Sequence, residues 1–200
     1  MAEAGHPTTQ QAPLERLLTS LRTRRVARYA EGRVVLDFGC GQMFRTLRAL
    51  EGKARRRVGL DVAFAGKAPF TTPDGIDVVS DVAQLTAMGA SRPEIDCVTS
   101  LACFEHLETP DMQAVLRQLA AVTTRDAVLV GTVPTPPAKP VLEFLSYKLG
   151  LIDKSQILDH KVYYDQSALR AALVGTGWQM VEYARFQIGF NSFFKLIKTS

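Results

Sequence analysis

The sequence predicts an α/β protein with a doubly wound, Rossmann-like, mostly parallel sheet of seven strands that ends in an antiparallel C-terminal strand pair. Short apolar runs alternate with stretches of helical periodicity up to residue 133, which is typical of a parallel sheet covered by helices on both faces. Several runs end in glycine or aspartate, as strands do at the ligand-binding edge of such sheets. Two final apolar runs flank Gly189 closely enough to pair as antiparallel strands.

The expected elements follow in chain order. A polar tail over 1–13 precedes an amphipathic helix over 14–30, which is indicated by apolar spacing at Leu14, Leu17, Leu18 and Leu21. Apolar runs then predict strands at 34–38, 58–60, 76–80, 95–100 and 127–133. A helix begins at Thr109, because a hydroxyl is followed by proline at the first helical position. Asp165 caps a later helix, and the last two strands are expected at 178–186 and 190–197.

Composition limits the class of protein. The 200 residues suit one domain, here expected over 14–200. With 46% hydrophobic and 22% charged residues, the chain is neither disordered nor fibrous. The net charge of +4 permits a nucleic-acid partner without requiring one.

The cysteines and apolar runs predict the location. Cys40, Cys97 and Cys103 form no CxxC pair, which argues against a disulfide framework and a closed zinc site, so no metal is expected. This usage fits a reducing, cytoplasmic location. No apolar run is long enough to predict a transmembrane segment, and the first residues do not resemble a signal peptide.

The turn after the first strand predicts a nucleoside-containing cofactor. Gly39 and Gly41 allow the backbone to approach a ligand closely, and Asp61 ends the next strand, where a carboxylate can accept hydrogen bonds from ribose hydroxyls. Phe44 stands where a dinucleotide fingerprint needs glycine or alanine. Asp37 would repel a pyrophosphate and instead suits a cationic group such as an ammonium or a sulfonium.

Four motifs carry a resemblance to a known family. The runs VVLDFGCGQ, VGLDVA, IDVVSDVAQL and IDCVTSLACFEHL resemble, in order, the motifs of class I S-adenosylmethionine-dependent methyltransferases, closest to the small-molecule subgroup called type 11. The resemblance covers about residues 30–133 and continues more weakly through DHKVYYDQSALRAALVGTGW. It departs at Met43, where the family often has a third glycine, and at 123–126, where the family tends to have Lys-Pro-Gly-Gly.

The resemblance implies a role for each matching residue. The methionine part of S-adenosylmethionine would lie on the turn formed by Asp37, Gly39, Cys40 and Gly41. Asp61 would accept from the ribose hydroxyls, and Val62 would lie against the adenine. Asp81 would accept a hydrogen bond from the adenine amino group, and Val82 would offer its backbone amide to the adenine. Ser100 and Leu101 would lie under the cofactor at the end of the fourth strand. Asp81 also fits a purely structural role as a helix N-cap.

Candidates for catalysis and acceptor binding follow the fourth and fifth strands. His106 could remove a proton from an attacking hydroxyl, although a structural hydrogen bond is an alternative role. His160 is a second candidate. Four prolines begin an insertion at 134–164 that is expected to form a lid, where the acceptor could contact Phe144, Tyr147 and Tyr163. A permanently packed helix is the alternative for 141–152.

The predicted function is methyl transfer from S-adenosylmethionine to a small-molecule, sugar or lipid acceptor, with oxygen favoured as the acceptor atom. Residues 100–103 read Ser-Leu-Ala-Cys, which does not match the Asn/Asp-Pro-Pro-aromatic run of base-directed amino methyltransferases. An RNA-directed enzyme is an alternative supported by the arginines at 22, 24, 25, 28 and 55–57, but no aromatic platform accompanies them. A non-catalytic, cofactor-binding interaction module is the other alternative. The sequence leaves the oligomeric state open.

Overall fold

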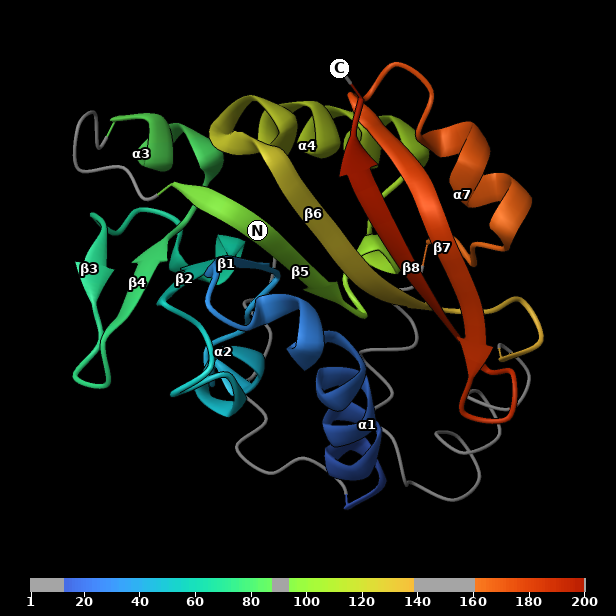
Figure 1. Ribbon diagram of the computed structural model, residues 1–200, viewed down its shortest axis with the longest axis horizontal. Coiled ribbons are helices and arrows are strands. Elements are labelled where there is room, and N and C mark those ends of the chain that lie inside the picture. The colour runs from blue at the N-terminus through green and yellow to red at the C-terminus, as the bar shows by residue number, and fades with distance from the viewer. Residues whose placement is uncertain (1–12, 88–93, 139–160, 200) are drawn as a thin grey trace, which may run out of the picture.

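An eight-stranded sheet runs through the molecule in the order β3-β4-β2-β1-β5-β6-β8-β7 (Figure 1). The computed structural model describes residues 13–87, 94–138 and 161–199. Within them the strands are β1 (Val34–Phe38), β2 (Arg56–Leu60), β3 (Phe70–Thr71), β4 (Ile76–Val79), β5 (Ile95–Leu101), β6 (Thr123–Pro134), β7 (Trp178–Phe186) and β8 (Asn191–Lys198).

The strand directions confirm the predicted fold class. β1, β2, β4, β5 and β6 are parallel neighbours, and β8 is antiparallel to both β6 and β7. The expected count of seven strands was wrong by one, because β3 pairs antiparallel with β4 through Phe70 and Thr71. A strand of two residues has no periodicity from which it could be predicted.

Helices cover both faces of the sheet, as the doubly wound fold requires (Figure 1). One face carries α1 (Pro13–Ala30) and α2 (Arg45–Ala49), and the other carries α3 (Val82–Ala87), α4 (Thr109–Val122) and α7 (Gln166–Ala172). The helix α4 has its N-cap at Glu108, one residue before the expected Thr109. Asp165 caps α7 as predicted, since its carboxylate accepts from the Ala168 amide at 2.8 Å. In the described residues, no helix is long and apolar enough to cross a membrane.

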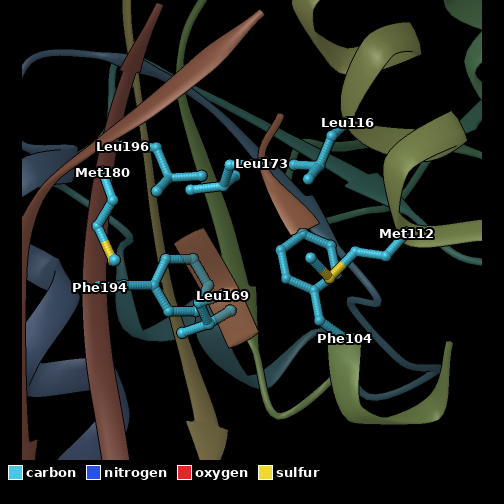
Figure 2. Close-up of a pocket in the computed structure, with 8 residues that line it drawn as sticks. All are labelled: Phe104, Met112, Leu116, Leu169, Leu173, Met180, Phe194 and Leu196. Atoms are coloured by element: carbon cyan, nitrogen blue, oxygen red, sulfur yellow. The ribbon is translucent and has the colours of Figure 1, made fainter. Parts of the chain in front are cut away.

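Apolar side chains fill the space between the sheet and α4 and α7. Figure 2 shows a narrow gap there, too small for a water molecule, lined by Phe104, Met112, Leu116, Leu169, Leu173, Met180, Phe194 and Leu196. The rings of Phe104 and Phe194 stack with centroids 6.2 Å apart. A side chain at Gly131 would collide with the Phe194 ring, so this glycine is needed for the close approach of β6 and β8. The gap is part of the core and offers no ligand site.

The order of the strands defines where a ligand can bind. From β1 the sheet continues to β2 and β4 on one side and to β5 and β6 on the other. The chain therefore leaves β1 and β5 in opposite directions, which opens a crevice beyond their carboxyl ends. The predicted tail and most of the predicted lid fall on residues 1–12 and 139–160, outside the described residues.

Candidate cofactor site

The glycine turn after β1 lies at this crevice. Its backbone is held to β2 by a hydrogen bond of 2.9 Å from the Gly39 amide to the Leu60 carbonyl. Gly39 and Gly41 have φ angles of +78° and +61°, which favour glycine. A side chain at Gly39 would collide with Cys103, whereas one at Gly41 would meet only open space. The backbone at Gly41 is thus free to be approached by a ligand.

Asp61 connects the tip of β2 to this turn. Its Oδ2 accepts from the Gly41 amide at 2.7 Å, and its Oδ1 accepts from the Ala63 amide at 2.8 Å, which starts the 3-10 helix η1 (Val62–Phe64). A carboxylate has about four acceptor positions, so two stay available for ribose hydroxyls. The arrangement fits the cofactor that the sequence predicts.

Two apolar side chains are exposed at the same edge. Val62 directly follows Asp61 and is 79% exposed, and Met43 follows the glycine turn and is 55% exposed. Exposed apolar groups beside hydrogen-bonding groups are typical of sites for planar, partly apolar ligands. Val62 is therefore free to lie against an adenine ring.

Asp37 lies deeper, inside the sheet. Asp37 is 2% exposed, and its Oδ1 accepts from the Thr99 hydroxyl of β5 at 2.6 Å. Burial raises the pKa of Asp37 to about 7, while hydrogen bonds from Thr99 and Thr46 lower it and the charge of Asp61 raises it further. Asp37 thus braces β1 against β5 and α2, and a cation beside it would favour its ionised form.

Asp81 caps a helix in this structure. Its Oδ1 accepts from the Gln84 amide at 2.9 Å at the start of α3, and its Oδ2 accepts from the Ser80 hydroxyl at 3.1 Å. This geometry is that of the structural alternative stated for Asp81. Val82, the next residue, packs partly against the core. Contacts of Asp81 and Val82 with an adenine stay predictions.

Cys40 points into the protein and away from the crevice. It is 8% exposed, and its Sγ fills the space beside Gly59 on β2. Burial raises the pKa of its thiol far above the ordinary value, so it is not a nucleophile at neutral pH. Only its backbone is available to a ligand. Ser100 is fully buried at the end of β5, and Leu101 beside it is half-buried.

His106 ends the 3-10 helix η3 (Phe104–His106), just beyond β5. It is half-buried, and its amide donates to the Cys103 carbonyl at 3.0 Å. Because Cys103 lies against Gly39, His106 belongs to the same end of the crevice. Tyr163 is half-buried and follows Val162, whose amide donates to the Glu105 carbonyl at 3.2 Å. His160, Phe144 and Tyr147 lie outside the described residues.

Comparison with known proteins identifies the family. A sequence model described as a methyltransferase domain matches residues 10–183. The chain belongs to this methyltransferase family. That membership confirms the expected class I methyltransferase, an enzyme whose cofactor is S-adenosylmethionine.

Solved structures share the fold of this methyltransferase at low sequence identity. An S-adenosylmethionine-dependent methyltransferase from Anabaena variabilis is 13% identical with a TM-score of 0.65, over 94% of this chain and 86% of that one. A magnesium protoporphyrin IX methyltransferase from Synechocystis is 15% identical with a TM-score of 0.59, over 100% and 90%. A possible exported protein from Bordetella parapertussis is 18% identical with a TM-score of 0.61, over 100% and 75%. No curated protein matches the chain at a significant level.

The methyltransferase buries Glu105, a residue with no predicted role, beside His106. Its side chain is 1% exposed, and its Oε2 has no hydrogen-bond partner among the described residues. Burial raises the pKa of Glu105 to about 7, although the nearby basic groups His106 and Arg22 oppose the shift. The only sequence signal was an acid next to a candidate histidine.

Two strained residues at this edge of the methyltransferase were also missed. Ala102, after β5, and Phe44, before α2, have φ angles of +53° and +50°. Residues other than glycine rarely adopt this conformation, which costs about 1–3 kcal/mol and often marks a functional site. Both flank the crevice, which supports its assignment as the ligand-binding edge.

Glu105 makes the stability of this methyltransferase depend on pH. The free energy of unfolding is expected to fall as the pH rises from about 4.5 to about 7. In that window the buried carboxyl stays protonated in the folded protein, whereas in the unfolded chain it ionises near 4.5. The folded state then binds more protons, so each pH unit costs up to about 1.4 kcal/mol per group. Urea unfolding at several pH values measures the slope.

A variant isolates this contribution from that of Asp37, whose raised pKa acts in the same direction. Glu105→Gln should make the slope shallower without removing it. Glu108→Gln, at an exposed position of the same segment, serves as the matched control and should keep the wild-type slope. An unchanged slope in Glu105→Gln would contradict the prediction.

Proposed function

We propose that this methyltransferase transfers a methyl group from S-adenosylmethionine to an oxygen atom of a small-molecule acceptor in the cytoplasm. The observation that carries the proposal is the position of Asp61, whose carboxylate contacts the glycine turn and keeps acceptor positions for a ribose. The neighbour from Synechocystis supports it, because its structure is a methyltransferase of a small molecule, magnesium protoporphyrin IX, with bound S-adenosylhomocysteine. The three free cysteines support the location.

The residues around the crevice divide the work of holding the cofactor. Asp61 accepts hydrogen bonds from the ribose hydroxyls. Val62 covers the adenine, and Asp81 accepts a hydrogen bond from the adenine amino group. The methionine part lies on the backbone of the glycine turn, with Asp37 behind it favouring a positively charged ligand. The bound cofactor supplies an electrophilic methyl group on a good leaving group. The chain therefore has mainly to place the acceptor oxygen in line.

His106 accepts the proton of the acceptor hydroxyl on a ring nitrogen as the oxygen attacks. Tyr163 contacts the acceptor in this proposal. It directly follows residues 161 and 162, whose amides donate to the carbonyl of Glu105, the neighbour of His106. His160, Phe144, Tyr147 and the lid over 134–164 belong to the same proposal on the sequence evidence alone. An apolar lid would exclude water from the reacting atoms.

The structure offers less support for an RNA acceptor. Three of the arginines that favoured it pair with carboxylates at 2.7–3.8 Å: Arg28 with Glu182, Arg56 with Asp77 and Arg57 with Glu51. Paired arginines contribute little to a basic surface that could follow a phosphate backbone.

Calorimetric titration of S-adenosylhomocysteine into the full chain tests the proposal, with saturable binding at one site as the expected result. No binding at millimolar ligand would contradict it. Incubation with isotope-labelled S-adenosylmethionine and a panel of hydroxylated or amino-bearing small molecules then tests the acceptor. Mass spectrometry should find the added methyl group on oxygen, and products methylated only on nitrogen would correct the acceptor atom.

A further inference from the structure

A second cavity lies between α1 and α2. These two helices cover the opposite face of the sheet from α4 and α7 (Figure 1). It has a volume of about 410 Å³ and is lined by Thr19, Ser20, Thr23, Arg24, Ala27, Arg45, Ala49 and Lys53. We call these residues the basic groove. The proposed methyl transfer uses none of them.

The chemistry of the basic groove favours an anion. Three of its described side chains are cationic and three carry hydroxyl groups, and none of the described residues that line it is acidic. Arg24 and Lys53 are exposed, and their side chains make no ion pair with any described residue. Elsewhere in the described chain four arginines do pair with carboxylates, namely Arg28, Arg48, Arg56 and Arg57. Arg24 and Lys53 thus place two positive charges, neither of them in an ion pair with a described residue, on one cavity, which favours an anion there.

The walls of the basic groove are held in place. Val26 and Ala30 of α1 are fully buried against the sheet, which fixes the helix that carries Arg24. The Lys53 carbonyl accepts from the Gly32 amide at 2.8 Å, so the turn after α2 is tied to the end of α1. A preformed site spares the ligand much of the entropic cost of ordering these segments.

We propose that the basic groove binds a small molecule carrying two or more phosphate groups. Arginine and lysine form charge-assisted hydrogen bonds with phosphate oxygens, and hydroxyl groups add neutral ones. The volume suits a small-molecule ligand. The described residues that line the groove include no aromatic side chain, and therefore offer no stacking surface of the kind that single-stranded nucleic acids use.

The position of the groove connects it to the cofactor site. Arg45 is the first residue of α2, and this helix follows the turn that contains Gly41 and the strained Phe44. A phosphate held by Arg45 would thus contact the segment that shapes the cofactor turn. The proposal itself does not depend on methyl transfer, because it rests on the lining and charge of the groove.

Calorimetric titration of inorganic pyrophosphate into the full chain, at low ionic strength, tests the proposal. We expect saturable binding at one site. The double variant Arg24→Gln/Lys53→Gln should weaken it about tenfold or more, because two charge-assisted hydrogen bonds are lost. The double variant Arg117→Gln/Arg125→Gln removes the same charge from exposed positions outside the groove and should retain the wild-type affinity within about twofold.

Three results would overturn the proposal: no saturable pyrophosphate binding to the wild-type chain, equal weakening in both double variants, or an oligouridylate that binds the groove in place of pyrophosphate. Circular dichroism and thermal melting verify that the variants fold. If the groove variant does not fold, Lys53→Gln alone replaces it, since Lys53 lies in an exposed turn, with Arg117→Gln as its control. Failure of S-adenosylhomocysteine to bind would contradict the proposed function and leave the pyrophosphate result interpretable.

Discussion

Asp61→Ala is expected to weaken binding of S-adenosylhomocysteine by about 10-fold to 100-fold. The variant loses the carboxylate that would accept hydrogen bonds from the ribose, and each charge-assisted hydrogen bond contributes about 1.5–3 kcal/mol. It also loses the 2.7 Å hydrogen bond from the Gly41 amide, which holds the glycine turn against β2. Calorimetric titration of the ligand into the wild-type and variant proteins measures the change.

A second variant separates ligand contact from turn geometry. Asp61→Asn keeps the size of the side chain and one acceptor oxygen, so the turn can retain part of its support while the charge is removed. Its affinity should lie between those of the wild type and Asp61→Ala. Asp77→Ala, which removes a carboxylate of β4 that pairs with Arg56, is the control and should bind normally. Wild-type affinity in Asp61→Ala would exclude this residue from the cofactor site.

His106→Ala is expected to lower turnover by about 100-fold or more while the affinity for S-adenosylhomocysteine stays close to that of the wild type. Removal of the acceptor's proton and retention of the cofactor are separate tasks, and general bases typically contribute at least this much. Single-turnover methyl transfer to an acceptor identified in the panel measures the first quantity, and calorimetry measures the second.

The conservative variant His106→Gln distinguishes catalysis from structure. Glutamine can replace a hydrogen bond of the imidazole but cannot accept a proton at neutral pH. It should therefore be as slow as His106→Ala. If glutamine restores turnover, or if turnover is unchanged in His106→Ala, the histidine has a structural role next to Glu105.

Much of the fold could be predicted because its signals are local. The apolar runs of β1, β4 and β5, the proline at the start of α4 and the Asp165 cap each lie within a few residues of the element they define. Boundaries that depend on a neighbour were missed. β2 begins at Arg56 instead of Val58, since Arg56 and Arg57 pair with the start of β1 at Val34 and Val35. β6 begins at Thr123 instead of Ala127, because its first residues join β5 across a register shift.

The candidate site divides in the same way. Gly39, Gly41 and Asp61 could be placed together from sequence, since parallel strands bring their carboxyl ends to one edge, and the Gly41–Asp61 hydrogen bond agrees with that placement. The helix-capping bond of Asp81 spans only three residues and was one of the two roles predicted for it, whereas the inward direction of Cys40 depends on a contact with Gly59 of another strand.

The sequence by itself determined the alternation of strands and helices, the glycine turn and the acid at the tip of β2, because each depends on the pattern of residues within a few positions along the chain. Only the tertiary structure decided the burial of Glu105, the positive φ of Ala102 and the basic groove. Residues 161 and 162, distant in the chain, lie against Glu105 and donate their amides to its carbonyl. The basic groove forms only because α1 and α2 lie next to each other. Burial and electrostatic environment arise between segments distant in the chain, and local periodicity carries no information about which segments will meet.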